Sequence, residues 1–502
     1  MTNSALNNIE HINACQNKTV DQLLDTVLTK VGYGTFHKKL LLLCGLGWLA
    51  DNMWLQTIAI ILPRVQEYYV ISDNLIGVLS SSLFAGMTFG AFFWGSYSDA
   101  NGRKVPYTMT LLITSIFGAI SSFAFNFTSL CICLFFLGFG VGGNMPTDGA
   151  LYLEFLPKEY HYLLTFMSVF FSFGAVLASI FGYVILPCDD GCDGSRWRVM
   201  LFVVASVTFS MFIIRSFLIK LPETPKFLMH QGKPDEVIIV LQDIARVNGS
   251  HIDIDKNELS LMECEQVEEE EYEGVQDEIS PMLLSSDREL LVEEEKGVKG
   301  RTQAIKELLG LKWRRTTLLI WSIWTFTSVA YTMFNVFLPK FLETFGEEST
   351  KPTLSQVYWD YMIYSLAGMP GSVIASYLIE TRLGRKGTMA LSALGSSLSL
   401  FVFSAINSRL IIVASSSSVS FLATLLYAVI YGYTPEVFDT SVRGTAVGTA
   451  SALGRIAGII SPVMAGILYI TSPSLPLYMS VVAYLVVGGC ILLLPFETRK
   501  IK

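Results

Sequence analysis

GSYSDANGRK, from Gly95 to Lys104, is a polar stretch between two apolar runs of the chain. Each flanking run has about 20 residues, the length at which a helix crosses the hydrocarbon core of a bilayer. The stretch therefore predicts a tight loop at a membrane surface. Arg103 and Lys104 predict that this surface is cytoplasmic, because basic residues are retained on that side.

The positions inside this stretch have separate physical reasons. Gly95 predicts the close approach of a neighbouring helix, because it has no side chain. Asp99 is placed to pair with Arg103 or to cap the following helix. Gly102 permits a turn that residues with a Cβ resist. The stretch alone also fits a charged turn that only sets the topology.

The composition is that of an integral membrane protein. Of the 502 residues, 52% are hydrophobic and 16% are charged, whereas soluble domains carry about 25% charged residues. The net charge is −8, no basic face indicates nucleic acid, and the eight cysteines lack the paired spacing of a metal site. No constellation of nucleophile and base is recognisable, so we expect neither an enzyme nor a bound cofactor.

Apolar runs predict an all-helical fold with twelve transmembrane helices in two sets of six. They are expected at residues 40–63, 74–96, 105–126, 129–152, 162–185, 198–220, 316–340, 354–379, 387–406, 410–433, 445–470 and 475–495. Seventeen lysines and arginines flank the ends that would face the cytoplasm, against six at the opposite ends. This asymmetry predicts that both termini are cytoplasmic.

An acidic segment separates the two sets and contains the run EEEEYE at residues 268–273. A block of like charges with few aromatic residues does not bury enough surface to fold. We expect a largely disordered cytosolic linker, either plainly solvated or regulatory, with short helices around residues 234–246 and 302–309. The predicted organisation is a solvated cytosolic tail (1–37), a first half (38–220), the linker (221–315), a second half (316–495) and a C-terminal tail (496–502).

The two halves repeat one another. YLIETRLGRKGTM, from Tyr377 to Met389, also lies between two spans and matches the opening stretch. Two halves of six spans are typical of transporters, in which the substrate site lies near the midplane between them. The matching residues are Gly384, Arg385 and Lys386 with the acid Glu380, and a second pair of motifs places Glu154 and Glu436 at cytoplasmic helix ends, the latter followed by Arg443.

A third motif, LPETPKFLM from Leu221 to Met229, follows the sixth span. Pro222 and Pro225 end the helix, and Glu223 is placed to accept hydrogen bonds from loop amides or from basic residues of nearby turns. Together the motifs resemble those of the major facilitator superfamily of secondary transporters. The strings GWLADNMWLQ, GFGVGGNMPTDGALYLEFLP and TSVRGTAVGTASALGRIAGIISP resemble the branch related to synaptic vesicle protein 2, close to the sugar porters.

This resemblance implies alternating access and a cytoplasmic charge network that latches the two halves in the outward-open state. Leu134 and His161 stand where the family often has arginines, which weakens the first-half side of the network. Independent surface ion pairs are the alternative. The implied network comprises Gly95, Asp99, Gly102, Arg103, Lys104, Glu154, Glu223, Glu380, Arg385, Glu436 and Arg443.

Asp51 lies about halfway along the first span. Burying a charge at this depth costs at least about 2.5–3.5 kcal/mol, so such a residue indicates a function. A buried carboxylate can load and release a proton, and proton-coupled members of the family that the chain resembles carry an acid at the matching place. We expect Asp51 to carry the proton, and permanent pairing with a buried cation is the alternative.

Arg455, in the eleventh span, is expected to bind an anionic group of the substrate or to pair with Asp51. NMPTDG predicts a break in the fourth span that presents Asn144 and Asp148 to a cavity. Arg215, near the end of the sixth span, is expected to extend to the interface. Further candidates for the cavity wall are Trp54, Gln56, Tyr331, Asn335, Tyr361 and Tyr364, while Cys188 and Cys192 form a disulfide or stay free thiols.

These features predict a secondary transporter that couples protons to the uptake or exchange of a small organic solute, with a carboxylate or other organic anion favoured. Two alternatives stay open: a sugar or organic cation carrier of the same fold, and a non-transporting receptor or adaptor that acts through the acidic segment. We expect a monomer whose partners are solute, protons and membrane lipid. The expected location is the plasma membrane or an endomembrane, the endoplasmic reticulum or vacuole.

Overall fold

The computed structural model describes residues 24–187, 194–218, 221–249, 305–344, 352–406, 408–438 and 440–495, and within these ranges the chain is helical, without strands. Cys188, Cys192 and the acidic run lie outside the described residues. The long helices are α2 (Thr35–Tyr69), α3 (Asp73–Asn101), α4 (Lys104–Ser121), α5 (Phe127–Phe155), α7 (Ser168–Ile185), α8 (Arg196–Leu218), α13 (Arg314–Thr344), α14 (Leu354–Leu378), α15 (Gly384–Ala405), α16 (Arg409–Val437), α17 (Thr440–Thr471) and α18 (Leu475–Leu492). Shorter elements are η1 (Lys158–Tyr160), α6 (Tyr162–Phe166), α9 (Pro225–His230) and α10 (Pro234–Asn248).

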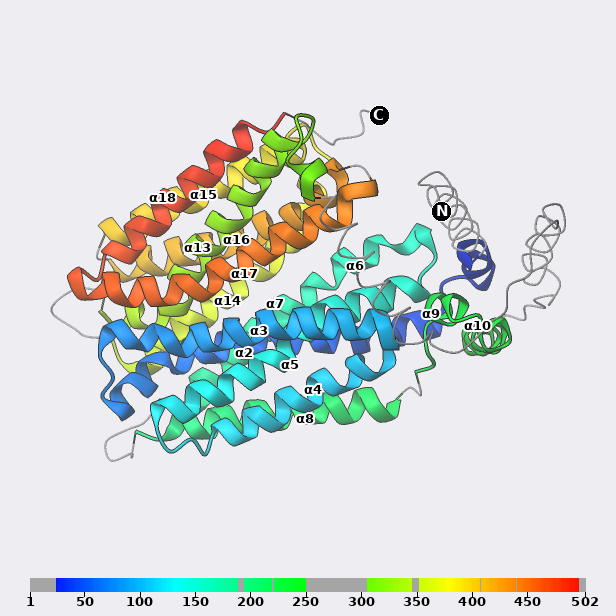
Figure 1. Ribbon diagram of the computed structural model, residues 1–502. Coiled ribbons are helices and arrows are strands. Elements are labelled where there is room, and N and C mark those ends of the chain that lie inside the picture. The colour runs from blue at the N-terminus through cyan, green and yellow to red at the C-terminus, as the bar shows by residue number, and fades with distance from the viewer. Residues whose placement is uncertain are drawn as a thin grey trace, which may run out of the picture.

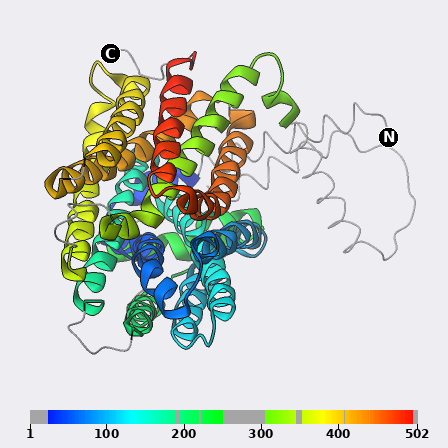
Figure 2. The ribbon, with the colours of Figure 1, turned by 90° about the vertical axis from the view of Figure 1, so that its left-hand side faces the viewer.

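The long helices form two bundles, one from α2 to α8 and one from α13 to α18 (Figure 1). Figure 2 views them from one end, with the N-terminal bundle below the C-terminal one. Three helix pairs join the bundles: α3 with α17, α7 with α14, and α2 with α13. The two-half architecture agrees with the internal repeat, while the predicted domain boundaries at 38–220 and 316–495 stay a prediction.

Nine of the described helices are long and apolar enough to cross a membrane. The remaining long helices, α2, α4 and α14, also have 18 residues or more but do not contain a sufficiently apolar window. Their polar side chains point inward, as the buried Asp51, Thr110 and Ser365 illustrate. The polarity of these three helices therefore comes from the interior they line, and twelve spans stay a prediction.

The polar stretch from Gly95 to Lys104 is mostly helical, so the prediction that it forms a loop is wrong. α3 continues to Asn101, and only Gly102 and Arg103 separate it from α4. Gly102 has φ 95°, and a Cβ there would lie 2.6 Å from a carboxylate oxygen of Glu223. The turn therefore requires glycine, as predicted. We call the end of the molecule that carries this α3–α4 turn the inner end, and the opposite end the outer end.

The close helix approach predicted for Gly95 is found elsewhere. A Cβ at Gly95 would meet no atom within 4 Å. At Gly86 and Gly142 it would lie 1.9 Å from the Phe135 carbonyl oxygen and 2.0 Å from that of Met87. These glycines allow α3 and α5 to pack backbone to backbone, whereas Gly95 lies near the inner end of α3, where no helix covers it.

The segment before α2 is packed rather than solvated. Leu24, Val27, Leu28 and Val31 recur at helical spacing and are buried against α10 at the inner end. The Asn248 side chain at the end of α10 accepts a hydrogen bond from the Phe36 amide at 3.0 Å. The prediction of a solvated tail is therefore wrong for residues 24–36, because their apolar face has a partner. The short helix predicted around residues 234–246 is confirmed as α10.

Candidate functional site

Asp51 lies at the middle of α2 with only 1% of its surface exposed. Its Oδ1 accepts a hydrogen bond of 2.7 Å from the amide of Asn144 on α5. Its Oδ2 is buried without a hydrogen-bond partner. A carboxylate with one satisfied and one unsatisfied oxygen in the interior is suited to holding a proton on the free oxygen.

Polar side chains from both bundles meet near Asp51. Gln56, just over one turn further along α2, bonds to Asn52 at 3.2 Å and accepts a hydrogen bond from the Tyr361 hydroxyl of α14. The Tyr364 hydroxyl donates to Asn335 on α13 at 2.9 Å. The structure thus brings Gln56, Tyr361, Tyr364 and Asn335 to the interface between the bundles.

Arg455 is half-buried on α17 and faces α3. Its guanidinium donates to the carbonyl oxygen of Met87 at 3.3 Å, and no ion pair of Arg455 is found among the described residues. Asp51 is bonded to Asn144 instead. Of the two predicted roles for Arg455, pairing with Asp51 is therefore not formed in this conformation, and the guanidinium remains available to an anion.

Asp148 forms an ion pair with Arg215 at 2.6 Å, and both side chains are fully buried. Arg215 also donates to the carbonyl oxygens of Tyr107 at 2.6 Å and Leu43 at 3.0 Å, and lies over the Tyr107 ring at 4.0 Å. The prediction that Arg215 extends to the interface is wrong, because Asp148 and two carbonyls bind its terminal nitrogens inside the N-terminal bundle. The predicted break in span four is also absent, since α5 is continuous through Pro146.

Two other predicted cavity residues differ in their surroundings. The Trp54 indole donates to Thr208 of α8 at 3.0 Å and is fully buried inside the N-terminal bundle. Tyr331 packs edge-on against Tyr427 of α16, with ring centroids 5.5 Å apart. Trp54 therefore faces away from the bundle interface in this conformation, whereas Tyr331 belongs to an aromatic wall of the C-terminal bundle.

At the outer end, ion pairs cross between the bundles. Arg64 of α2 pairs with Glu343 of α13 at 2.6 Å. Lys340 of α13 pairs with Asp73 of α3, and its ammonium also bonds to Gln66 at 2.7 Å. None of these residues was predicted from the sequence to form a site. In the sequence, these residues are marked only by their position near helix ends. Each base lies more than 200 positions from the acid with which it pairs, so no local motif connects them.

The environments of the two outer acids differ. Burial raises the pKa of Glu343 above its ordinary value, and the nearby Arg64 only partly offsets this. Burial also acts against ionisation of Asp73, but hydrogen bonds from Lys340 and Gln66 and the charge of Lys340 outweigh it and lower its pKa. Closing the outer end is therefore electrostatically costly at Glu343 and favourable at Asp73.

Several residues of the predicted network contact one another at the inner end of the N-terminal bundle. The Arg103 guanidinium pairs with Asp99 at 2.5 Å and with Glu154 at 3.1 Å. The Glu223 carboxylate accepts the backbone N–H groups of Arg103 at 2.8 Å and Lys104 at 3.4 Å. Glu223 thus caps the turn through loop amides, one of the two roles predicted for it.

The C-terminal bundle repeats this arrangement. Gly384 has φ 64°, and Arg385 makes two contacts to Glu436, at 2.6 and 2.7 Å. Glu380 and Arg443 are exposed and form no ion pair with a described residue. The hydrogen bonds and ion pairs found between described residues of the two bundles all lie from the middle of the molecule to the outer end. The inner networks thus stay within their bundles, and the inner ends diverge in Figure 1.

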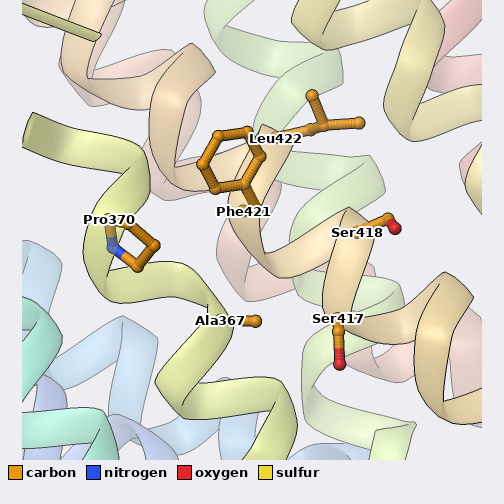
Figure 3. A pocket seen from close by; sticks show the side chains of 6 residues that line it. All are labelled: Ala367, Pro370, Ser417, Ser418, Phe421 and Leu422. Atoms are coloured by element: carbon orange, nitrogen blue, oxygen red, sulfur yellow. The ribbon is translucent and has the colours of Figure 1, made fainter. Parts of the chain in front are cut away.

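A groove lies on the C-terminal bundle between α14 and α16 (Figure 3). Its lining combines small side chains with larger apolar ones, and none of the predicted cavity residues belongs to it. It therefore lies outside the polar cluster around Asp51. The lining residues are Ala367, Pro370, Ser417, Ser418, Phe421 and Leu422.

Comparison with protein families identifies the fold. The model of the Major Facilitator Superfamily matches residues 41–390 and 320–502. The chain belongs to the major facilitator superfamily. The predicted resemblance is thereby confirmed, and the chain is a multi-pass membrane transporter rather than an enzyme.

Relatives span nearly the whole chain. It is 32% identical to MFS siderochrome iron transporter 1 of Ceriporiopsis subvermispora, in an alignment that covers 95% of this chain and 90% of that protein. It is 29% identical to organic cation/carnitine transporter 7 of Arabidopsis thaliana, with 95% of this chain and 94% of that protein covered. It is 26% identical to a synaptic vesicle 2-related protein of Pongo abelii, covering 95% and 81%. A crystal structure of a D-xylose–proton symporter superposes with a TM-score of 0.66 at 15% identity, over 93% of this chain and 99% of that one, so this likeness concerns the fold.

Proposed function

We propose that this major facilitator protein couples protons to the transport of a small organic solute that carries a carboxylate or another anionic group. The observation that carries the proposal is Arg455. It is a half-buried guanidinium on a helix at the bundle interface, bonded to a backbone carbonyl and to no described carboxylate. A planar guanidinium binds carboxylates through two parallel hydrogen bonds.

Asp51 supplies the proton site in this proposal. It lies at the same level of the molecule as the polar cluster of Asn52, Gln56 and Tyr361, and its Oδ2 has no partner. When Asp51 is protonated, the net charge of the interior around Asp51 and Arg455 rises by one relative to the ionised state. An anionic solute at Arg455 is then held more strongly, which couples proton binding to solute binding.

The outer ion pairs support alternating access in this proposal. In the proposed cycle, the present conformation is closed at the outer end by Arg64–Glu343 and Lys340–Asp73. It faces inward, since the inner networks do not join the bundles. The proposal includes twelve spans, both termini in the cytoplasm and a functional monomer in the plasma membrane or an endomembrane.

The test is thermal stabilisation of the purified protein by a panel of carboxylates, sugars and amines at two pH values. A ligand that binds the folded state raises the apparent unfolding temperature. We expect a carboxylate to stabilise the wild type, to fail with Arg455→Ala, and to act weakly with Arg455→Lys, which keeps the charge but loses the bidentate geometry. Asp51→Asn should remove the pH dependence of the stabilisation. Equal stabilisation of wild type and Arg455→Ala would refute the anion site.

An organic cation is the second candidate, because aromatic rings line the C-terminal bundle. Tyr431 is 53% exposed and packs on Trp324 with ring centroids 4.8 Å apart. Aromatic faces attract cations when these are desolvated. An amine that stabilises Arg455→Ala but not Tyr431→Ala would favour this candidate, whereas a sugar that stabilises both variants would favour a carrier for neutral solutes.

The adaptor alternative makes a separate prediction. Deletion of residues 263–295 in the acidic segment should leave ligand-induced stabilisation and uptake intact in a transporter. An adaptor would lose its cellular phenotype on the same deletion.

A further inference from the structure

The Asp148–Arg215 pair lies directly beside the proposed proton site. A Cβ at Gly47 would lie 1.9 Å from Asp148 Oδ2 and 2.6 Å from an Arg215 nitrogen, so the pair packs on the α2 backbone at Gly47. Gly47 is one helical turn from Asp51 on α2. Asn144, which bonds to Asp51, is one turn from Asp148 on α5. The two carboxylates therefore occupy neighbouring turns of two packed helices.

This cluster contains more acid than base. If both carboxylates ionise, two negative charges share the one guanidinium of Arg215 in a region closed to water. Burying an uncompensated charge is costly, so the cluster favours holding one proton. The ion pair of 2.6 Å favours the ionised form of Asp148 over that of Asp51, which leaves Asp51 as the group that takes the proton first.

We infer that Asp148 is a positioning residue for the proton site: by holding Arg215, it keeps the guanidinium from Asp51 and leaves Asp51 able to bind a proton. The inference rests on the proposed role of Asp51. Three buried atoms without hydrogen-bond partners support it. Asp148 Oδ1 and the Nε of Arg215 are buried without partners, as is Asp51 Oδ2. The cluster thus contains hydrogen-bonding atoms that the single ion pair does not use.

The other charged and titratable groups around the cluster are few. Cys44 from α2 and Tyr107 from α4 lie close to the ion pair, and Arg455 from α17 acts on Asp51 from the other bundle. α3 and α7 carry titratable side chains only near their ends. Arg215 is therefore the cation inside the N-terminal bundle that decides whether Asp51 is paired.

Two substitutions should move proton binding in opposite directions. Asp148→Asn removes the counterion of Arg215, so the guanidinium acts on Asp51 and favours its ionised form. Arg215→Gln leaves two carboxylates without a cation and favours proton retention. For charges roughly two helical turns apart, Coulomb's law gives a shift of about one pH unit in each direction, a tenfold change in proton binding. The double variant Asp148→Asn/Arg215→Gln removes both charges and should return to the wild-type midpoint.

Infrared titration of the full-length protein in nanodiscs measures this without a solute. The signal is the carbonyl band of a protonated, buried carboxyl group, assigned to Asp51 by its loss in Asp51→Asn. We expect the midpoint of this band to fall in Asp148→Asn, to rise in Arg215→Gln and to recover in the double variant. A structural role would lower stability in all three without this opposed pattern. If Asp148→Asn does not fold, the Arg215→Gln and double variants still decide.

A matched control is the pair Asp360–Arg409 in the C-terminal bundle, with two contacts of 3.1 Å. Asp360→Asn/Arg409→Gln should leave the midpoint unchanged. A band that Asp51→Asn removes but that neither Asp148→Asn nor Arg215→Gln moves overturns the inference alone. A spectrum in which Asp51→Asn removes no band overturns both the inference and the proposed proton site.

Discussion

At the outer end, Arg64 and Lys340 pair with acids of the opposite bundle, whereas at the inner end Arg103 and Arg385 pair with acids of their own bundle. The side chains are of the same kind, and the arginines are buried to a similar degree: Arg64 is 15% exposed, Arg103 and Arg385 16% each. The main difference lies in which bodies the pairs connect, although Arg64 also pairs with Glu67 of its own helix at 2.7 Å.

We call an ion pair between the bundles a gate and an ion pair within one bundle a brace. An ion pair between bundles must break when the bundles rotate apart, so it contributes to one conformation only. An ion pair within a bundle persists through that motion and stabilises every conformation. The outer pairs should therefore control the conformational equilibrium, and the inner pairs, as they stand here, should control stability.

The largest effect is expected from Arg64→Ala. This change leaves the half-buried Glu343 without the arginine that pairs with it at the closed outer end. A hydrogen bond to a charged group contributes about 1.5–3 kcal/mol, so the ratio of closed to open molecules should fall at least about 10-fold. Val70 and Leu410 are exposed at the outer ends of the two bundles. Double electron–electron resonance between spin labels at these two positions should show a longer distance in Arg64→Ala than in the wild type.

Arg409→Ala is the matched control, because Arg409 also lies at the outer end but pairs within its own bundle. The labelled distance should stay at the wild-type value in this variant. If Arg64→Ala and Arg409→Ala give the same distance distribution, the distinction between gates and braces fails.

A smaller effect, of another kind, is expected from Arg103→Ala. Loss of the contacts to Asp99 and Glu154 should lower the apparent unfolding temperature by about 3–6 °C. The outer distance between the spin labels should not change in the wild-type background. The latch implied by the family resemblance adds a sharper test: in the Arg64→Ala background, Arg103→Ala should return the protein towards the closed outer end. No return would leave Arg103 a brace in every conformation.

The same residues show which structural features could be predicted from the sequence. Local spacing was sufficient for Gly102, Arg103 and Glu223, because a turn, its charge and its capping acid lie in short motifs with one structural solution. It was also sufficient for the repeat, in which Arg385 and Glu436 mirror Arg103 and Glu154 in sequence.

Spacing was insufficient where partners are distant in sequence. Arg64 and Glu343 are 279 positions apart, and Arg215 and Asp148 are 67 apart on helices whose rotation no motif fixes. A charge near a helix end reads as an interfacial residue until the packing of the neighbouring helices is known. For this reason Arg215 was predicted at the interface and was found as the buried partner of Asp148.

The smallest effect expected is the pH dependence of outer closure. In the closed form the pKa of Glu343 is raised above its ordinary 4.5, so its contribution to closure is fully present below pH 4.5 and is lost as the pH rises through the closed-form pKa. The pKa of Asp73 is lowered from 3.8, so its contribution is present above 3.8 and is lost only at lower pH. From pH 4.5 upwards, Asp73 is constant and Glu343 alone should change closure.

We therefore expect the labelled outer distance to shift towards the open value, by a few-fold in population, as the pH rises from about 5 to about 7.5. Glu343→Gln, which imitates the protonated acid, should remove this dependence and hold the closed distance at both pH values. Arg64→Ala should steepen it, since closure then requires a proton on Glu343. An outer end that opens as the pH falls would place the proton-sensitive closure on Asp73 and contradict the assignment to Glu343.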